Sequence, residues 1–304
     1  MSSGSVRLAH RRSATVGEDV SAHHGRRRGR QHSPFRLALS QTLLSIVALI
    51  FLAPMIWMVL SALKPGAEVF TTPPKLFGSA IQWSNFRDAW NYVPFGRFII
   101  NTFLVAAAGT IITVVTSAMS AYAFARLHFR FRDALFVLYL ATLIVPQEII
   151  VIPMFLIMQR LGWVNSFQSL ILPWAFTAFG TFLLRQFFLT VPRELEEAAK
   201  IDGAGHVRIL TAVIAPIAAP AFAVLGVFTF LAYWNSFLWP LIIVNDTDHA
   251  TVPLGLQLFL SQNGQRWELL MAAATISMAP TVLLVLALQK YLVRGIALSG
   301  LGGR

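Results

Sequence analysis

Long stretches without a charged residue are the feature of this sequence that most restricts its fold. A helix that crosses a hydrocarbon core of about 30 Å needs about 20 mostly apolar residues. Stretches of this kind occupy residues 37–63, 98–125, 134–159, 161–184, 209–245 and 269–289, with Glu148 as their one charge. Because Pro216 and Pro220 lie near the start of the fifth stretch, we expect its span at about 221–244. The sequence therefore predicts an all-α, polytopic membrane protein with six transmembrane helices.

The composition excludes the main soluble alternatives. Apolar residues make up 56% of the 304 residues and charged residues only 12%, whereas soluble domains carry roughly 25% charged residues. A net charge of +11 is typical of nucleic-acid binders, but a water-soluble basic domain cannot contain such long uncharged stretches. The absence of cysteine excludes disulfide scaffolds, thiolate metal sites and cysteine nucleophiles.

The distribution of Lys and Arg predicts the orientation and the domain limits. With both termini in the cytoplasm, the inner segments contain 18 basic residues and the outer segments 6, as the positive-inside rule requires. We expect residues 1–36 to form a disordered, basic cytoplasmic tail, although an organellar transit peptide is also compatible with their composition. A membrane domain over 37–294 and a cytoplasmic C-terminal extension over 295–304 complete the chain.

The inner loop between spans four and five, at about 190–216, has the pattern of a short helix. Pro192 suits the first turn, three glutamates follow where the helix dipole favours negative charge, and Gly203 ends the helix. Leu195, Ala198, Ala199 and Asp202 recur on one face. An amphipathic helix lying on the bilayer is the ordinary alternative, but such helices combine bulky apolar residues with basic ones. Four acids and little bulk favour the groove of a protein partner.

The same loop carries a family resemblance. Glu197-Ala-Ala, followed by Gly203 and by Val213-Ile-Ala-Pro216, resembles the EAA loop of ABC-importer permease subunits, with Val213 and Ala215 in place of the usual Ile and Leu. Further stretches resemble the six-span partner of the maltose-type carbohydrate permeases: 121–126 (AYAFAR), 145–153 (VPQEIIVIP), 234–240 (WNSFLWP) and 289–295 (QKYLVRG). The resemblance extends from about residue 37 to residue 300.

The resemblance implies a mechanism and a set of partners. In this family the EAA helix is a coupling helix that sits in a cleft of an ATP-binding subunit. By motif position, Glu197 makes the charged contact, Ala198 and Ala199 pack closely, and Gly203 provides the bend. The candidate coupling residues are Glu194, Glu197, Ala198, Ala199, Asp202, Gly203 and Pro216. The implied partners are a second permease subunit, two ATP-binding subunits and an extracytoplasmic solute-binding protein, in a bacterial plasma membrane.

The chain lacks the residues for its own ATP hydrolysis. A phosphate-binding loop needs Gly-Lys-Ser/Thr after a glycine-rich turn, and none of the four lysines, Lys64, Lys75, Lys200 and Lys290, has that context. We therefore expect no enzyme activity, no cofactor and no metal site in this chain, with ATP and Mg²⁺ on the partner subunit. Four of the seven histidines, His10, His23, His24 and His32, lie in the N-terminal tail and show no metal-ligand spacing.

Polar and aromatic residues inside the spans are candidates for the substrate pathway. They are Glu148, Tyr233, Trp234, Asn235 and Trp239. Intramembrane ionisable groups mark transport pathways, but Glu148 is equally compatible with contact to water or a partner subunit. An aromatic cluster can likewise be an interfacial belt. Asn235 within a span needs a hydrogen-bond partner.

Two classes of transporter remain open on the sequence alone. The first is a permease subunit of an ATP-driven importer for a carbohydrate, such as a di- or oligosaccharide, or for glycerol phosphate. The second is a stand-alone secondary transporter or channel for a polar solute, which disagrees with the scarcity of ionisable groups in the spans. A membrane-embedded lipid or glycan enzyme is a third, less favoured reading, because no polar catalytic cluster is evident.

Overall fold

Every regular element in the described part of the chain is a helix. The structure, a computed structural model, describes residues 34–260 and 265–301. The α-helices are α1 (Pro34–Ala62), α2 (Ser84–Tyr92), α3 (Phe95–Arg126), α4 (Arg132–Ala141), α5 (Gln147–Arg160), α6 (Phe167–Ile171), α7 (Ala178–Thr190), α8 (Arg193–Ile201), α9 (His206–Arg208), α10 (Ala215–Ile217), α11 (Ala219–Trp234), α12 (Leu238–Ile243), α13 (Val252–Leu256) and α14 (Trp267–Leu301). Short helices of other types are the π-helix Ile209–Ile214 and the 3₁₀ turns Gly66–Glu68, Thr142–Ile144, Leu172–Trp174 and Gln257–Leu260. The described residues thus confirm the predicted helical fold.

The described part of the chain divides into two units, with the boundary between Leu52 and Ala53. In the first unit, the described residues are the beginning of α1, and large apolar side chains such as Leu44, Ile50 and Phe51 are exposed. A surface of this kind requires lipid or another protein against it. The tail predicted over 1–36 lies outside the described residues up to position 33, and 34–36 already belong to α1.

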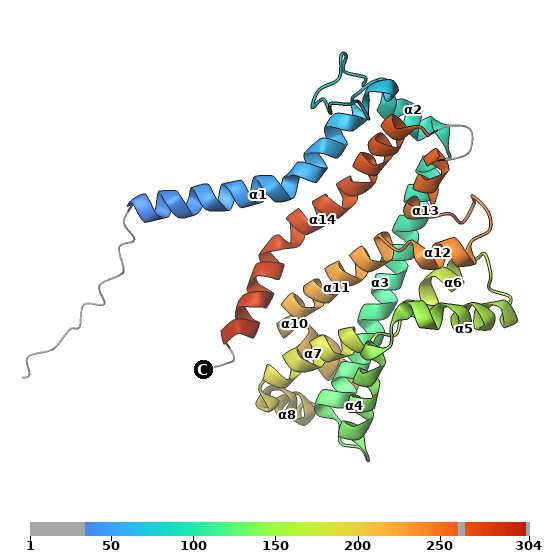
Figure 1. The fold of residues 1–304 in the computed structure, drawn as a ribbon. Coiled ribbons are helices and arrows are strands. Elements are labelled where there is room, and N and C mark those ends of the chain that lie inside the picture. The colour runs from blue at the N-terminus through green and yellow to red at the C-terminus, as the bar shows by residue number, and fades with distance from the viewer. Residues whose placement is uncertain (1–33, 261–264, 302–304) are drawn as a thin grey trace, which may run out of the picture. The chain divides into compact units, whose positions relative to one another are not determined.

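The second unit is built around α3. This helix packs against α7 and α11, and α14 packs against α11 and α2 (Figure 1). The buried face of α3 carries small residues, among them Ala106, Gly109, Ser117 and Ala121. Small residues let helix backbones approach closely where the surroundings are apolar. The position of α3 between its neighbours therefore follows from the spacing of these residues.

Three of the six predicted spans coincide with single continuous helices in the described residues. Among the described residues, three helices are long and apolar enough to cross a membrane: Ala38–Ala62, Phe95–Arg126 and Trp267–Gln289. They match the first, second and last predicted spans. Three further pairs qualify as spans only when each bent pair is taken together: Arg132–Ile144 with Gln147–Arg160 (100°), Phe167–Trp174 with Ala178–Thr190 (47°) and His206–Ile217 with Ala219–Trp234 (86°).

The stretches predicted as spans over 134–159, 161–184 and 221–244 are each interrupted in the structure, and prolines explain two of the interruptions. Val145 has an extended backbone with ψ 118°, because the residue before Pro146 is sterically driven out of the helical region. The helix expected over 221–244 ends at Trp234, and α12 begins separately at Leu238. Pro240 lies in the first turn of α12, a position that proline tolerates, whereas it would break a continuous helix.

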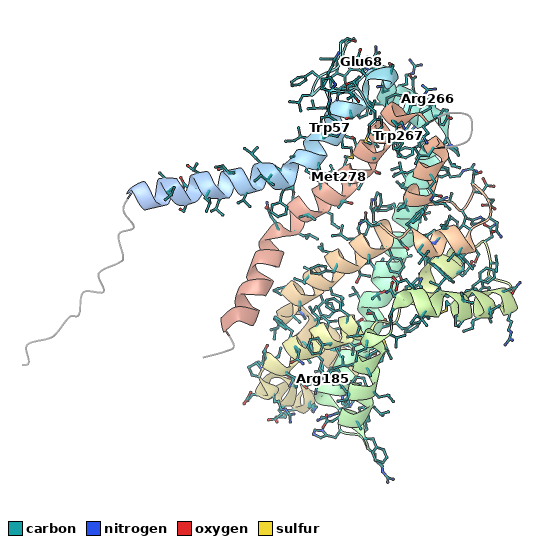
Figure 2. All side chains as sticks on the ribbon, in the orientation of Figure 1. Trp57, Glu68, Arg185, Arg266, Trp267 and Met278 are labelled. Carbon is teal, nitrogen blue, oxygen red and sulfur yellow. The ribbon has the colours of Figure 1, made fainter. Side chains whose placement is uncertain are left out.

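The second unit has two distinguishable ends. Figure 2 places Glu68, Arg266 and Trp267 together at one end, which we call the Trp267 end. There the Trp267 ring meets Phe70 edge-on at a centroid distance of 5.1 Å. At the opposite end, Arg185 donates a hydrogen bond of 3.2 Å to the carbonyl of Phe124, which lies in the last turn of α3. We call this the Arg185 end, and it also carries α8 (Figures 1 and 2).

Candidate functional site

The loop at the Arg185 end forms the helix that the sequence predicts. Pro192 precedes α8 as its N-cap, and Glu194 and Glu196 occupy the first turn, where they complement the helix dipole. The helix ends in a left-handed residue, Gly203, with φ +78°. The Gly203 N–H donates to the carbonyl of Lys200 at 3.0 Å, as in common glycine-terminated helices. The predicted limits of this helix therefore agree with the observed ones.

A buried ion pair attaches α8 to the end of α3. Nε of Arg126 lies 2.6 Å from Oε1 of Glu196, and only 3% and 6% of the two side chains are exposed. The angle of this approach does not make a hydrogen bond, so the attraction is that of two charges in contact. The Arg126 Nη2 donates to the carbonyls of Phe188 (2.6 Å) and Val191 (2.7 Å). One side chain thus connects α3, the end of α7 and α8.

A second contact from the same turn of α3 reaches the helix that follows α8. The hydroxyl of Tyr122 lies 3.0 Å from Nδ1 of His206, and the Tyr122 side chain is buried. His206 begins α9, which continues into the π-helix and then meets α11 at the 86° bend. The end of α3 therefore contacts both arms of the predicted coupling loop.

The predicted coupling residues divide into an exposed set and an attached set. Glu194, Glu197 and Ala198 are exposed, as are the apolar Leu195 (44%) and Ile201 (87%). Ala199 is half-buried and packs against the core formed by α3, α7 and the π-helix. Asp202 and Gly203 form the turn after α8, and Pro216 lies beyond the π-helix in α10, away from α8 itself.

Sequence reasoning overlooked the residues that attach the loop. Glu196 was one of four acids in the loop and was not assigned a role, and Arg126 entered only as the last letter of a family motif. The position of Arg126 could have indicated a partner, because an arginine at the end of a long apolar helix needs a counter-charge when it is buried. The candidate acids lay 70 residues away, and the sequence alone does not identify which of them turns inward.

A cavity of about 720 Å³ lies between α5, α7, α11 and α12. Of the five predicted pathway residues, Glu148, Tyr233 and Trp239 line it, whereas Trp234 and Asn235 do not. The polar atoms of the two lining aromatics are bonded within the chain. The Tyr233 hydroxyl donates to the carbonyl of Ile171 (2.8 Å), and the indole N–H of Trp239 donates to Ser169 (2.7 Å).

The two remaining pathway candidates have structural contacts instead. Trp234 is buried and its Nε1 donates to the carbonyl of Ser277 on α14 at 3.2 Å. The sequence predicts Asn235 within a span, whereas in the structure this residue is the C-cap at the end of α11. Its amide donates to the carbonyl of Leu231 at 2.9 Å, so the helix end itself satisfies the side chain.

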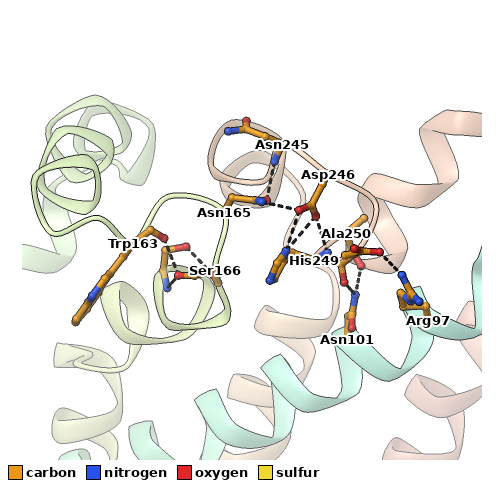
Figure 3. A network of polar contacts seen from close by, with 11 residues as sticks. Arg97, Asn101, Trp163, Asn165, Ser166, Asn245, Asp246, His249 and Ala250 are labelled. Carbon is orange, nitrogen blue, oxygen red and sulfur yellow. Dashed lines mark hydrogen bonds and ion pairs between the residues drawn. The ribbon is translucent and has the colours of Figure 1, made fainter.

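A polar network joins three separate segments near the start of α3 (Figure 3). Asn165, in the loop between α5 and α6, donates to Asp246 at 2.6 Å and accepts from the Asn245 N–H at 3.0 Å. His249 also contacts Asp246, through its backbone N–H (2.9 Å) and its Nδ1 (3.0 Å). The hydrogen bond from Asn165, followed by those from His249, lowers the pKa of Asp246 to about 2.

The same loop is attached to α3. Arg97 forms an ion pair with Asp248, and the Asn101 amide donates to the carbonyls of Asp248 (2.7 Å) and Ala250 (3.0 Å) (Figure 3). Arg97 and Asn101 lie in the first two turns of α3. This helix therefore has polar attachments at both ends: to the loop at 245–250 and, through Arg126, to α8.

Comparison with known proteins agrees with this architecture. Residues 113–298 match the model of the family described as binding-protein-dependent transport system inner membrane component. The sn-glycerol-3-phosphate transport system permease protein UgpE of Pectobacterium atrosepticum is 36% identical over 265 residues, which cover 84% of this chain and 94% of that one. The probable ABC transporter permease protein YurM of Bacillus subtilis is 35% identical over 254 residues, 82% and 83% of the two chains.

A solved structure shares the fold. It is the crystal structure of a bacterial ABC transporter involved in the import of the acidic polysaccharide alginate, with a TM-score of 0.73. The match covers 84% of this chain and 95% of that one, at 24% sequence identity.

Proposed function

Because the chain belongs to the family of binding-protein-dependent transport system inner membrane components, we propose that it forms half of the translocation pathway of an ATP-driven importer. In this proposal the energy comes from ATP and Mg²⁺ bound to a separate subunit. The substrate is a carbohydrate or a glycerol phosphate, since the relative from P. atrosepticum is named for sn-glycerol 3-phosphate.

The observation that carries the proposal is the two-sided character of α8. One side is held to α3 by the buried Arg126–Glu196 pair. The rest of its surface exposes the apolar Leu195 and Ile201 together with Glu194 and Glu197. Exposed apolar residues bordered by charges are typical of a surface that a protein partner covers. We assign this surface to the ATP-binding subunit.

The attachment of α8 explains how movement would reach the membrane. A partner that displaces α8 pulls on Arg126, and through it on α3 and the end of α7. It also displaces the helical segment that begins at His206 and meets α11 at an angle of 86°. Rigid elements joined at bends can convert a small rotation into a change of helix tilt. Gly203, Asp202 and Pro216 lie at the turns of this linkage.

The topology that accompanies the proposal has six spans and both termini in the cytoplasm. Each bent pair of helices then counts as one crossing, which is the upper number that length and hydropathy allow. The Arg185 end is cytoplasmic in this orientation, since the basic residues concentrate there. The Trp267 end faces outward, and with it the Asp246 network, which would meet the solute-binding protein.

The pathway itself is assigned to the cavity lined by Glu148, Tyr233 and Trp239. Trp234 and Asn235 contribute by fixing the end of α11. A second permease subunit would close the open side of this cavity, and two ATP-binding subunits would occupy the coupling helices of the pair.

Co-purification and vesicle transport test the proposal. The tagged chain is isolated from membranes of its own organism, and we expect an ATP-binding subunit to accompany it in the wild type but not in Glu197→Lys. The recovered complex in proteoliposomes should transport solute with ATP and without an ion gradient. Transport by the chain alone, driven by a proton or sodium gradient, would contradict the proposal and support a secondary transporter.

A further inference from the structure

Three interruptions of the helical backbone meet at one cavity. The break between α4 and α5 contributes Val145, the break before α7 contributes Thr177, and the break between α11 and α12 contributes Ser236 and Phe237. Non-helical backbone at membrane depth is tolerated where it is buried in protein or lines a water-filled space. Discontinuous helices are also a common feature of solute sites in transporters. The cavity of about 720 Å³ is large enough for a disaccharide-sized solute.

The charge of the cavity is set by a single residue. Among the residues that line it, all of them described, Glu148 is the one with a carboxylate and none carries a basic group. Glu148 lies in the first turn of α5, whose N-terminus presents roughly half a positive charge. A full negative charge at that position outweighs the helix dipole. The field in the cavity is therefore negative.

The remaining lining suits an uncharged polyhydroxy compound. Aromatic faces come from Trp174, Phe179 and Phe228, and hydroxyl groups from Thr142, Thr229 and Ser236. The indole Nε1 of Trp174 is buried and has no hydrogen-bond partner among the described residues. An unsatisfied buried donor is costly, and this one becomes available to a hydroxyl oxygen of a solute only when the Trp174 ring moves.

We infer that this cavity selects a neutral polyol or sugar and disfavours a solute that carries a phosphate. The inference rests on the proposed function and narrows its substrate class, since it separates carbohydrate from glycerol phosphate. A unit charge about 8 Å from a carboxylate, at an effective dielectric constant of about 30, changes occupancy by about tenfold. Glu148 is thus a residue that determines specificity by repulsion.

Thiol labelling measures this field directly, because the natural chain contains no cysteine. Ser236→Cys is introduced in the assembled transporter and labelled with a cationic and an anionic methanethiosulfonate of similar size, and adducts on this chain are quantified by mass. We expect the cationic reagent to react about a hundredfold faster than the anionic one, relative to their rates with free cysteine, since the same field attracts one and repels the other by about tenfold each. Glu148→Gln should bring this preference close to one.

A matched position separates the cavity from the general surface. Ser84 is exposed on α2, and the reagent preference of Ser84→Cys should not respond to Glu148→Gln. Thr229→Cys provides a second cavity position if Ser236→Cys disturbs assembly. Maltose should slow cavity labelling by the neutral methyl reagent, whereas sn-glycerol 3-phosphate at the same concentration should not.

Three outcomes would overturn the inference: equal reaction with both reagents, unreactive thiols at both cavity positions, or protection by glycerol phosphate that exceeds protection by maltose. The proposed function is judged separately. Co-purification of the ATP-binding subunit and ATP-driven uptake can succeed while the labelling preference is absent, and in that case only the substrate class is rejected.

Discussion

Arg126, the last residue of α3, and Glu196, in the first turn of α8, form an ion pair that is almost completely removed from solvent. Burying two charges is unfavourable unless each compensates the other. The pair therefore fixes the position of α8, because it holds one side of this helix against α3. The carbonyls of Phe188 and Val191 accept hydrogen bonds from the same guanidinium. The exposed side of α8 is consequently presented in one orientation.

Removing one member of this pair should be strongly destabilising. Glu196→Gln leaves the guanidinium of Arg126 buried without a counter-charge, and such a loss costs about 3–5 kcal/mol. We expect a lower thermal unfolding temperature of the detergent-purified complex and reduced ATP-driven uptake.

Glu194→Gln is the matched control for Glu196→Gln. It removes an equivalent charge from the exposed side of the same turn and should leave the unfolding temperature unchanged. The double exchange Arg126→Glu with Glu196→Arg should recover part of the loss seen with either single change. Equal unfolding temperatures for wild type and Glu196→Gln would show that the pair is not formed in the membrane.

Gly203→Pro should disconnect α8 from the following helix. Gly203 has φ +78°, and its N–H donates to the carbonyl of Lys200, whereas proline is confined to φ near −65° and has no N–H. Uptake should fall while the amount of protein in the membrane, measured by immunoblot, stays the same. Gly205→Ala is the control, because Gly205 has φ −76° and open space around it. Normal uptake by Gly203→Pro would remove this turn from the mechanism.

Reversing the exposed charge at Glu197 should weaken the partner contact without unfolding the chain. Since Glu197 has an exposed side chain, its replacement by lysine leaves no buried charge behind. We expect unchanged thermal stability, less co-purified ATP-binding subunit and lower uptake. A titration of purified ATP-binding subunit against the permease measures the affinity. An affinity equal to that of the wild type would exclude Glu197 from the interface.

A methyl group at Gly109 should displace the Tyr233 ring. A Cβ at this position would lie 2.5 Å from ring atoms of Tyr233, and overpacking of this kind costs about 1–3 kcal/mol. Gly109→Ala should therefore lower the unfolding temperature and the accessibility of the cavity thiol at Ser236→Cys. Gly226→Ala, on α11 with no other atoms near its Cβ position, should change neither quantity.

The Asp246 network should resist acid until far below neutral pH. Since the pKa of Asp246 is lowered to about 2 from an ordinary 3.8, its stabilising effect is complete above about pH 4 and is lost as the pH falls through 2. Asn165→Ala removes the largest cause of this shift, so the loop at 245–250 should loosen nearer pH 4. Hydrogen exchange of this loop, corrected for intrinsic rates, provides the measurement, and Asn91→Ala on α2 should behave as the wild type.

The agreement between sequence and structure is best where a local pattern decides the outcome. The limits of α8 follow from Pro192, the acidic first turn and Gly203, all within a dozen residues. The interruptions of the spans were not predicted, because hydropathy indicates that 134–159 is apolar but not that the chain turns by 100° near Pro146. Lys64 was counted as a loop charge, yet it is 1% exposed and donates to the carbonyl of Lys75.

In the candidate site, too, features set by neighbouring residues could be predicted and features set by distant contacts could not. Exposure of Glu194 and Glu197 could be anticipated from the dipole and the motif, because both depend on neighbouring residues. The inward position of Glu196 depends on Arg126, and the cavity depends on helix breaks at 145–146, 175–177 and 235–237. Contacts between residues so far apart in the chain need the folded structure.

One consequence follows from α3 alone. With 32 residues in a single unbroken helix it is about 48 Å long. It is bonded to the 245–250 loop at one end through Arg97 and Asn101, and to α8 at the other end through Arg126. Because α3 is one continuous helix, a displacement at either of its ends is expected to move the other end. In the importer proposed above, a protein that binds the 245–250 loop should therefore alter the affinity of α8 for the ATP-binding subunit, and by thermodynamic linkage the reverse effect must have the same size.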